Sequence, residues 1–274
     1  MLPAMTLRLF NFRGALPLRL PPMVPPPRLE SPPRIHAFLF NWRGQFERAR
    51  RTEAQLAEVL GRVTVINSDE EHTANGWIDV GDEYYFTAQY LEAIRRLDGD
   101  ILFHVQADAE YDDWGGVVRN AVEAFERYGW GVFAPNADFT GWSGDRVDLG
   151  PGLLPSEPDL RMVINTDSIA WFVHGDIVRR MRRHARRLRG NRLGWGVDLL
   201  AVGLSYLSGR PVIRDYRHTI RHPRSRGYDT RRAEIECERT VSRFGRALRR
   251  YARLALTDRR SLSELLRRAW ARPV

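Results

Sequence analysis

The stretch "DGDILFHVQADAEYDDW", residues 98–114, carries six carboxylates around one short apolar run. Residues 101–105 are bulky and β-prone, which predicts a buried strand that stops near Gln106. Asp108 and Glu110 follow this strand and point the same way if the chain stays extended. Because two like charges held that close repel, we expect a divalent cation, Mg²⁺ or Mn²⁺, between them. A solvated acidic loop is the alternative reading.

Strands and helices alternate outward from this stretch. Apolar periodicity predicts strands over residues 34–42, 62–69, 100–108 and 130–138. The intervening helices are predicted over residues 44–61, 83–97 and 114–129. This alternation predicts an α/β fold with a mostly parallel, Rossmann-like sheet flanked by helices. Ligands of such sheets bind at the carboxyl ends of the strands. Asn41, Trp42, Asp69 and the Asp108–Glu110 pair all fall at such ends.

The second half of the sequence is less regular. Residues 160–181 predict a strand, a turn, a second strand and an Arg-rich helix, and residues 210–223 predict a further strand. Residues 228–256 and 261–273 predict two terminal helices that are also rich in arginine. The first 33 residues contain repeated prolines and predict an extended, flexible arm.

The composition is that of a globular protein, with 43% hydrophobic residues in a chain of 274. Cys237 is the only cysteine, which excludes an internal disulfide and suits a reducing compartment. No apolar run reaches the roughly 18 residues that span a bilayer, and no signal peptide is recognisable. We therefore expect a cytoplasmic protein without a transmembrane segment.

The charge is strongly uneven along the chain. The formal net charge is +9, the basic residues are all arginines, and residues 179–192 hold eight of them without an acid. Acidic residues gather instead between Asp69 and Asp113. A basic flank beside an acidic centre suits a polyanionic partner such as nucleic acid, an anionic lipid headgroup or an acidic glycan. A solvated helix face is the alternative.

Asp198 lies in "GWGVDLL", residues 194–200, where two glycines allow a tight turn before a helix and present Trp195. An aspartate in a first helical turn is stabilised by the helix dipole, and it also suits a general base. His218 and His222 are four apart in a predicted strand and would face the same side. Either can supply a nitrogen ligand to a metal, with His222 preferred, or complete a core contact.

The order of "NSD", "ADAE", "NTDSIAWFVHGD", "GWGVDLL" and "HTIRHP" resembles that of inverting glycosyltransferases with the GT-A fold, over residues 34–228. The resemblance implies a nucleotide-sugar donor, UDP- or GDP-linked, and a metal held by Asp108, Glu110 and His222. It implies Asp198 as the base, with Asn41, Trp42 and Asp69 near the donor. A glutamate at 110 replaces the commoner aspartate.

The same resemblance divides the chain into an arm (1–33), a nucleotide-sugar half (34–115), an acceptor half (116–228) and a helical extension (229–274). The segments "GVFAPNAD", "INTDSIAWFV" and "RPVIRDYRHTIRHPRSRGY" are similar to small phage-type enzymes related to base J glucosyltransferase. That group implies 5-hydroxymethylcytosine or a related 5-hydroxymethylpyrimidine in DNA as acceptor, in the host cytoplasm if the gene belongs to a phage. Residues expected on the acceptor side are Asp167, Trp195, Arg226 and Tyr228.

Two other functions stay open from the sequence. The same chemistry on a bacterial cell-surface polysaccharide or lipid-linked glycan would use the arginines against an anionic membrane. A non-catalytic nucleic-acid-binding protein is the other reading.

Overall fold

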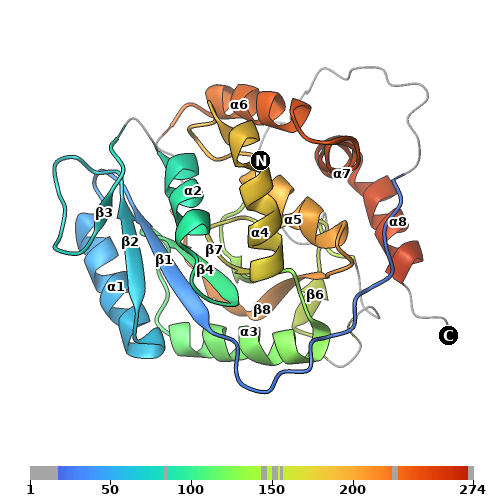
Figure 1. Cartoon of the computed structure of the whole chain (residues 1–274), viewed down its shortest axis with the longest axis horizontal. Coiled ribbons are helices and arrows are strands. Elements are labelled where there is room, and N and C mark those ends of the chain that lie inside the picture. Colours follow the sequence, from blue (N-terminus) through green and yellow to red (C-terminus); the bar gives the residue numbers. More distant parts are fainter. Residues whose placement is uncertain are drawn as a thin grey trace.

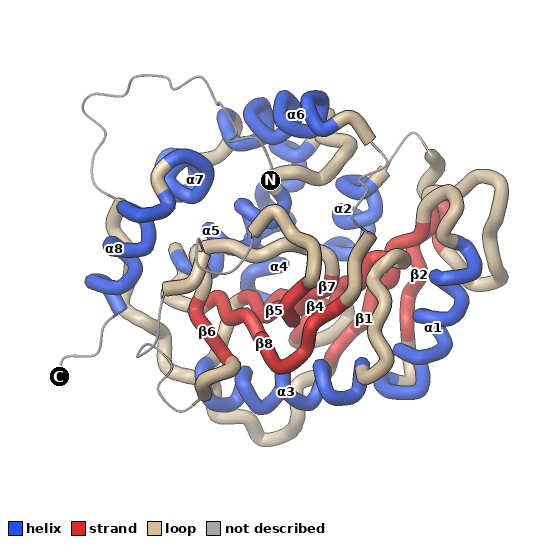
Figure 2. The backbone as a smooth tube through the Cα atoms, turned by 180° about the vertical axis from the view of Figure 1, so that it is seen from behind, coloured by secondary structure: helices blue, strands red, loops and turns tan. Residues whose placement is uncertain are grey.

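The computed structural model describes residues 18–82, 85–142, 147–149, 154, 157–223 and 228–270. Within them one eight-stranded sheet has the order β3-β2-β1-β4-β7-β5-β8-β6. Helices α1 and α3 lie together against one face, and α2, α4 and α5 lie together against the other (Figure 1). Figure 2 shows the same layering from behind. The sheet and its two helical layers confirm the predicted α/β architecture.

The first half of the chain follows the predicted alternation closely. Its elements are β1 (Ile35–Asn41), α1 (Phe46–Leu60), β2 (Val63–Asn67), β3 (Ile78–Asp79), α2 (Phe86–Arg96), β4 (Ile101–Gln106), α3 (Trp114–Tyr128) and β5 (Val132–Ala137). Strands β3, β2, β1 and β4 pair in parallel. The carboxyl ends of β1, β2 and β4 therefore meet at one edge, as the sequence predicts.

The second half inserts an antiparallel strand into the middle of the sheet. Its elements are β6 (Leu160–Met162), β7 (Ala170–His174), α4 (Gly175–His184), the short 3₁₀ helix η2 (Ala185–Leu188), α5 (Val197–Tyr206) and β8 (Val212–Ile220). Strand β7 runs antiparallel to both β4 and β5, whereas β5 and β8 are parallel. The sheet is thus mostly parallel, and β7 joins the two parallel groups.

The terminal region forms three helices and not the predicted two. These are α6 (Thr230–Ser242), α7 (Arg246–Thr257) and α8 (Arg259–Trp270). The first predicted helix ends early because Phe244 is buried and Gly245, with extended backbone, becomes the N-cap of α7. Glycine at this position interrupts the helical run.

Both ends of the described chain contact the body of the domain. The Pro-rich segment from Leu18 onward has neither helix nor strand before β1, and Val24 donates its backbone N–H to the Gly209 carbonyl at 2.8 Å. The Trp270 indole of α8 donates to the Pro21 carbonyl at 2.9 Å. No helix among the described residues has the length and apolar character needed to cross a membrane.

The terminal helices also hold the segment between β5 and β7. The Tyr251 hydroxyl of α7 donates to the Ile164 carbonyl. Arg267 of α8 donates to the Leu149 carbonyl at 2.6 Å. These helices therefore support the loops that follow β5 and β6.

Candidate active site

The end of β4 meets the end of β8 through a short antiparallel bridge. Glu110 and Arg221 exchange backbone hydrogen bonds of 2.9 and 3.1 Å. This bridge places His222 beside Asp108, with 3.6 Å between His222 Nε2 and Asp108 Oδ1. Two residues that the sequence assigns to a metal site are thus brought together from opposite halves of the domain.

The donor atoms of this pair suit a divalent cation. Asp108 Oδ1 and His222 Nδ1 are both buried without a hydrogen-bond partner. Burial raises the pKa of Asp108, while the neighbouring His222 and Arg48 oppose that rise. An unpartnered buried carboxylate oxygen is costly, and a cation would compensate that cost. The pair therefore fits an oxygen-and-nitrogen site for Mn²⁺ or Mg²⁺.

Glu110 is more exposed and faces arginines. Its side chain is 44% exposed, with Oε1 3.4 Å from Arg48 Nε and Oε2 4.0 Å from the Arg221 guanidinium. This orientation places Glu110 at the rim of the site.

His218 and His222, which the sequence expects on the same side, have different neighbours. The β8 backbone shifts register against β5, so that Pro135 pairs with Asp215 but Asn136 pairs with Thr219. This bulge breaks the strict alternation of side chains that the prediction assumed. His218 Nδ1 instead contacts the buried Asp215 carboxylate. His222 is therefore the histidine at the candidate metal site.

Asp198 is held by three hydrogen bonds at the start of α5. Its Oδ2 accepts from the Trp142 indole and from the Asn165 carboxamide, each at 2.9 Å. Its Oδ1 accepts from the Gly196 backbone N–H at 3.1 Å. Burial first, and then the nearby Asp167, raise the pKa of Asp198 to about 6 despite these hydrogen bonds. A carboxylate with that pKa is ionised at neutral pH and is a competent proton acceptor.

The two side chains that orient Asp198 were not singled out from the sequence. Asn165 stands inside the quoted "NTDSIAWFVHGD" motif, but a single asparagine carries no specific signal. Trp142 follows β5 in "TGWSG", where a tryptophan between glycines hints at a buried anchor in a loop. They contact one carboxylate only because loops after two different strands converge.

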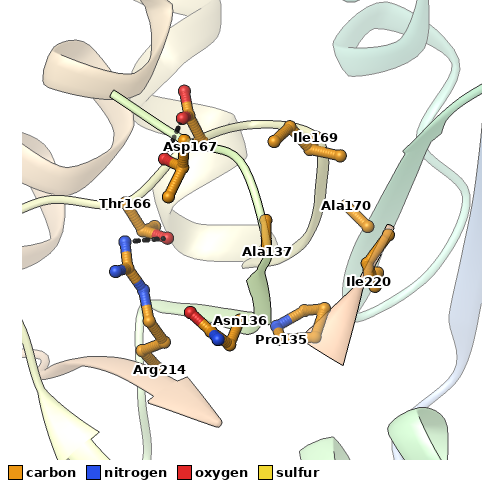
Figure 3. A pocket seen from close by; sticks show the side chains of 10 residues that line it. Pro135, Asn136, Ala137, Thr166, Asp167, Ile169, Ala170, Arg214 and Ile220 are labelled. Carbon is orange, nitrogen blue, oxygen red and sulfur yellow. Dashed lines mark hydrogen bonds between the residues drawn. The ribbon is translucent and has the colours of Figure 1, made fainter. Parts of the chain in front are cut away.

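A small pocket of about 10 Å³, roughly the room that one water molecule needs, is lined by residues of β5, β7, β8 and the adjoining loops (Figure 3). Its polar lining comprises Asn136, Thr140, Thr166, Asp167 and Arg214. Asp167 accepts hydrogen bonds from the Thr140 hydroxyl and from the Gly141 N–H. The sequence expected Asp167 on the acceptor side, and the pocket gives its carboxylate a defined position.

Residues of the pocket are linked to the candidate base and to the candidate metal site. On one side, Asp167 is close enough to Asp198 to raise its pKa. On the other, the pocket residue Ile220 immediately precedes the Arg221 bridge to Glu110. The pocket residue Ile169 accepts from the Gln106 N–H at 2.8 Å, just before Asp108. The pocket therefore adjoins segments that lead to the candidate base and to the candidate metal ligands.

Asn41 and Asp69 lie at the ends of β1 and β2. The buried Asn41 carboxamide donates to Asn67 Oδ1 at 2.7 Å, which ties the two strand ends together. Asp69 is 3% exposed, and its Oδ2 has no hydrogen-bond partner although His72 Nδ1 lies 3.4 Å away. Ligand atoms of Asp69, Glu71 and His72 lie within 4.8 Å of one another, but Glu71 already pairs with Arg43 at 3.0 Å.

Two aromatic side chains, Trp42 and Tyr85, lie between the end of β1 and Asp108 of the candidate metal site. Trp42 meets Tyr85 edge to face, with 5.8 Å between ring centroids, and the Arg192 guanidinium lies 5.7 Å from the Tyr85 ring. Burial raises the pKa of the Tyr85 hydroxyl, and Asp108 raises it further. Tyr85 was not predicted as a site residue, because nothing in its local sequence distinguishes it from a helix-flanking tyrosine.

Trp195 and Tyr228, two of the expected acceptor-side residues, contact each other directly. The Trp195 indole donates to the Tyr228 hydroxyl at 2.9 Å. Tyr228 also lies near Tyr85, whose hydroxyl pKa it helps to raise. Arg226, the remaining expected acceptor residue, falls outside the described residues.

No protein-family model matches the sequence, and no curated protein matches it. Solved structures do share the fold. A mannosyltransferase from Pyrobaculum calidifontis, solved with GDP-Man and Mn²⁺, aligns with a TM-score of 0.54 at 12% identity, over 90% of this chain and 76% of its own.

GalNAc-T7, solved with UDP, GalNAc and Mn²⁺, aligns with a TM-score of 0.51 at 10% identity, over 85% of this chain and 55% of its own. TarS residues 1–349 from S. aureus align with a TM-score of 0.50 at 11% identity, over 82% of this chain and 71% of their own. The chain therefore has the fold of these glycosyltransferases, the GT-A fold that the motif order predicts.

Proposed function

We propose that this protein is a metal-dependent, inverting glycosyltransferase that moves a sugar from a nucleotide-sugar to a hydroxyl acceptor. The observation that carries the proposal is that the domain brings Asp108 and His222 together as candidate metal ligands and also holds Asp198 as a hydrogen-bonded carboxylate with a raised pKa. Solved proteins of the same fold with GDP-Man and Mn²⁺, or with UDP and Mn²⁺, support the choice of donor and metal.

The roles of the two sides follow from charge. When bound, Mn²⁺ or Mg²⁺ supplies the positive charge that stabilises a departing nucleoside diphosphate. Asp108 and His222 would hold it, with Glu110 at the rim directly or through water. Asn41, Trp42, Asp69 and Tyr85 line the edge where the nucleoside would lie.

Asp198 accepts the proton in the transfer step. The acceptor O–H bond breaks toward the Asp198 carboxylate while the acceptor oxygen forms a bond to the anomeric carbon. The bond between that carbon and the diphosphate oxygen breaks with its electron pair on the diphosphate, so a single displacement inverts the configuration. Trp142 and Asn165 fix the carboxylate during this step.

For the acceptor we propose DNA that contains 5-hydroxymethylpyrimidines, 5-hydroxymethylcytosine first. The support is an exposed arginine surface on α4, η2 and the residue after η2, formed by Arg180, Arg183, Arg186 and Arg189. Within the described part of the chain none of the four pairs with a carboxylate, whereas the adjacent Arg179 pairs with Asp176. Unpaired surface guanidinium groups suit phosphate oxygens. The target base would have to leave the stack, at a cost of a few kcal/mol.

The test is a mass measurement on nucleosides. The protein is incubated with Mn²⁺, a panel of UDP- and GDP-sugars and DNA containing 5-hydroxymethylcytosine, and the digested nucleosides are weighed. We expect the mass of one hexose or pentose to be added, and the addition to be lost in Asp198→Asn. Sugar transfer to water or to another acceptor, with unchanged DNA, would overturn the DNA acceptor alone. No donor consumption under any condition would overturn the enzyme proposal and leave the non-catalytic reading.

A lipid-linked or cell-surface glycan is the second candidate acceptor. The same unpaired arginine surface suits the anionic headgroups of a membrane. Vesicles with and without anionic lipid, carrying a lipid-linked saccharide, provide the matched assay, and transfer only on anionic vesicles would favour this candidate over DNA.

A further inference from the structure

Arg214 is a buried cation at the floor of the pocket. It is 1% exposed and lies on β8 between Ala134 of β5 and Arg161 of β6. Among the described residues it forms no ion pair; the nearby Asp215 contacts His218, and Asp148 pairs with Arg161. A buried guanidinium without a carboxylate partner is costly, so its neutral hydrogen-bond acceptors must compensate.

Those acceptors belong to the two loops that orient Asp198. Arg214 donates to the Trp142 carbonyl at 2.6 Å and to the Asn165 carbonyl at 3.4 Å. It also donates to the Thr166 hydroxyl at 3.1 Å (Figure 3). Trp142 follows β5 and Asn165 follows β6, so the planar fork of one arginine joins two loops that are distant in sequence. The side chains of these same two residues donate to Asp198 Oδ2.

We propose that Arg214 is a positioning residue for Asp198: by fixing the backbones of Trp142 and Asn165, it aims their two N–H groups at one carboxylate oxygen. The catalytic meaning of this inference rests on the proposed function. Displacements of about 1 Å in such supports reduce rates on the order of a hundredfold. Arg214 need not contact donor or acceptor for this effect.

The first test does not require any substrate. The Trp142 indole N–H, assigned by Trp142→Phe in a ¹⁵N-tryptophan spectrum, reports on Asp198 because the two are hydrogen-bonded. Its signal should move as pH passes through about 6, where Asp198 titrates. The other titratable groups around Asp198 are Asp167, Cys237 and Tyr251, and the variants leave all three in place.

In Arg214→Met we expect the midpoint of this titration to rise by at least half a pH unit, or the signal to lose its pH dependence, because the donors to the charged form are loosened. Arg210→Met is the control, since Arg210 also donates to a backbone carbonyl, that of Gly129, from a largely buried position, although it pairs with Asp176 as well. The remaining tryptophan signals report whether each variant is folded.

An unchanged Trp142 midpoint in a folded Arg214→Met protein would overturn the inference. If Arg214→Met does not fold, Arg214→Lys, which keeps the charge but loses the fork, is measured in the same way. Failure of both to fold while Arg210→Met folds would assign Arg214 to stability alone and also overturn it. With active wild-type protein, kcat of Arg214→Met should fall on the order of a hundredfold with donor KM nearly unchanged. If wild-type protein transfers no sugar, the indole titration still decides the role of Arg214.

Discussion

Glu110 and Arg221 pair through two backbone hydrogen bonds and thereby set the distance between Asp108 and His222. One ligand follows a strand in the parallel first half, and the other follows β8 in the second half. The candidate metal site therefore forms only when the whole sheet is assembled.

If Asp108 and His222 hold a cation, replacing either residue should weaken cation binding. Asp108→Asn and His222→Ala should each reduce the affinity for Mn²⁺ in the presence of UDP or GDP by at least about tenfold, because even outer-shell partners of metals contribute that much. Titration calorimetry with each nucleotide measures the change. Asp112→Asn, which removes an exposed neighbouring acid, is the control and should bind as wild type does. Equal affinities in all four proteins would contradict the site.

Asp198 predicts a cost in stability that depends on pH. Its pKa in the folded protein, about 6, lies above the ordinary value of 3.8, so the folded state binds the proton more tightly than the unfolded state. The contribution of Asp198 to the free energy of unfolding is therefore complete below pH 3.8 and is lost as the pH rises through about 6. When the pH rises from 4.5 to 7.5, the free energy of unfolding of Asp198→Asn should therefore increase by about 2 kcal/mol relative to that of wild type.

Urea unfolding of both proteins at the two pH values measures this gain. The absolute difference also includes the hydrogen bond from Gly196, which an asparagine amide cannot accept on its nitrogen, but the change with pH does not. A difference that stays constant from pH 4.5 to pH 7.5 would show that Asp198 titrates normally.

His104 predicts the opposite dependence on pH. It is completely buried against Phe40, and neither ring nitrogen has a hydrogen-bond partner. Burial lowers its pKa to about 3, below the ordinary 6.5, so the unfolded state takes up the proton first. When the pH falls from 7.5 to 5, the free energy of unfolding of wild type should decrease by about 2 kcal/mol relative to that of His104→Leu. Urea unfolding at these values checks it, and parallel losses in the two proteins would contradict it.

Gly194 and Gly190 form a matched pair for the turn before Asp198. Both have positive φ, +82° and +80°, which costs an alanine about 1–2 kcal/mol. A Cβ on Gly194 would lie 2.1 Å from the Phe86 ring, whereas one on Gly190 would have no neighbour within 4 Å. Gly194→Ala should therefore unfold about 1–3 kcal/mol more easily than Gly190→Ala. Equal denaturation midpoints would mean that Phe86 moves aside freely.

The sequence predicts the first half of the fold well for a physical reason. Strands β1, β2 and β4 are continuous apolar runs that end at polar residues, and each following helix has an amphipathic period. Parallel neighbours share an edge, so Asp69 and Asp108 could be placed without knowing any contact. Asp198 was recognisable because a Gly-rich turn precedes it.

The second half depends on pairing that local sequence does not encode. The residues of β7 read as a strand, but nothing in them specifies antiparallel pairing with β4 and β5. The bulge in β8 lies between Asp215 and Thr219, and it arises only against β5. Trp142, Asn165 and Arg214 meet through three elements, so their shared relation to Asp198 becomes visible only in three dimensions.

The contacts from Tyr251 and Arg267 to the loops after β5 and β6 have a consequence for engineering. Anyone who wishes to retarget this scaffold by transplanting those loops from another enzyme should transplant α7 and α8 with them. Foreign loops grafted alone would not place carbonyl groups where Tyr251 and Arg267 donate their hydrogen bonds.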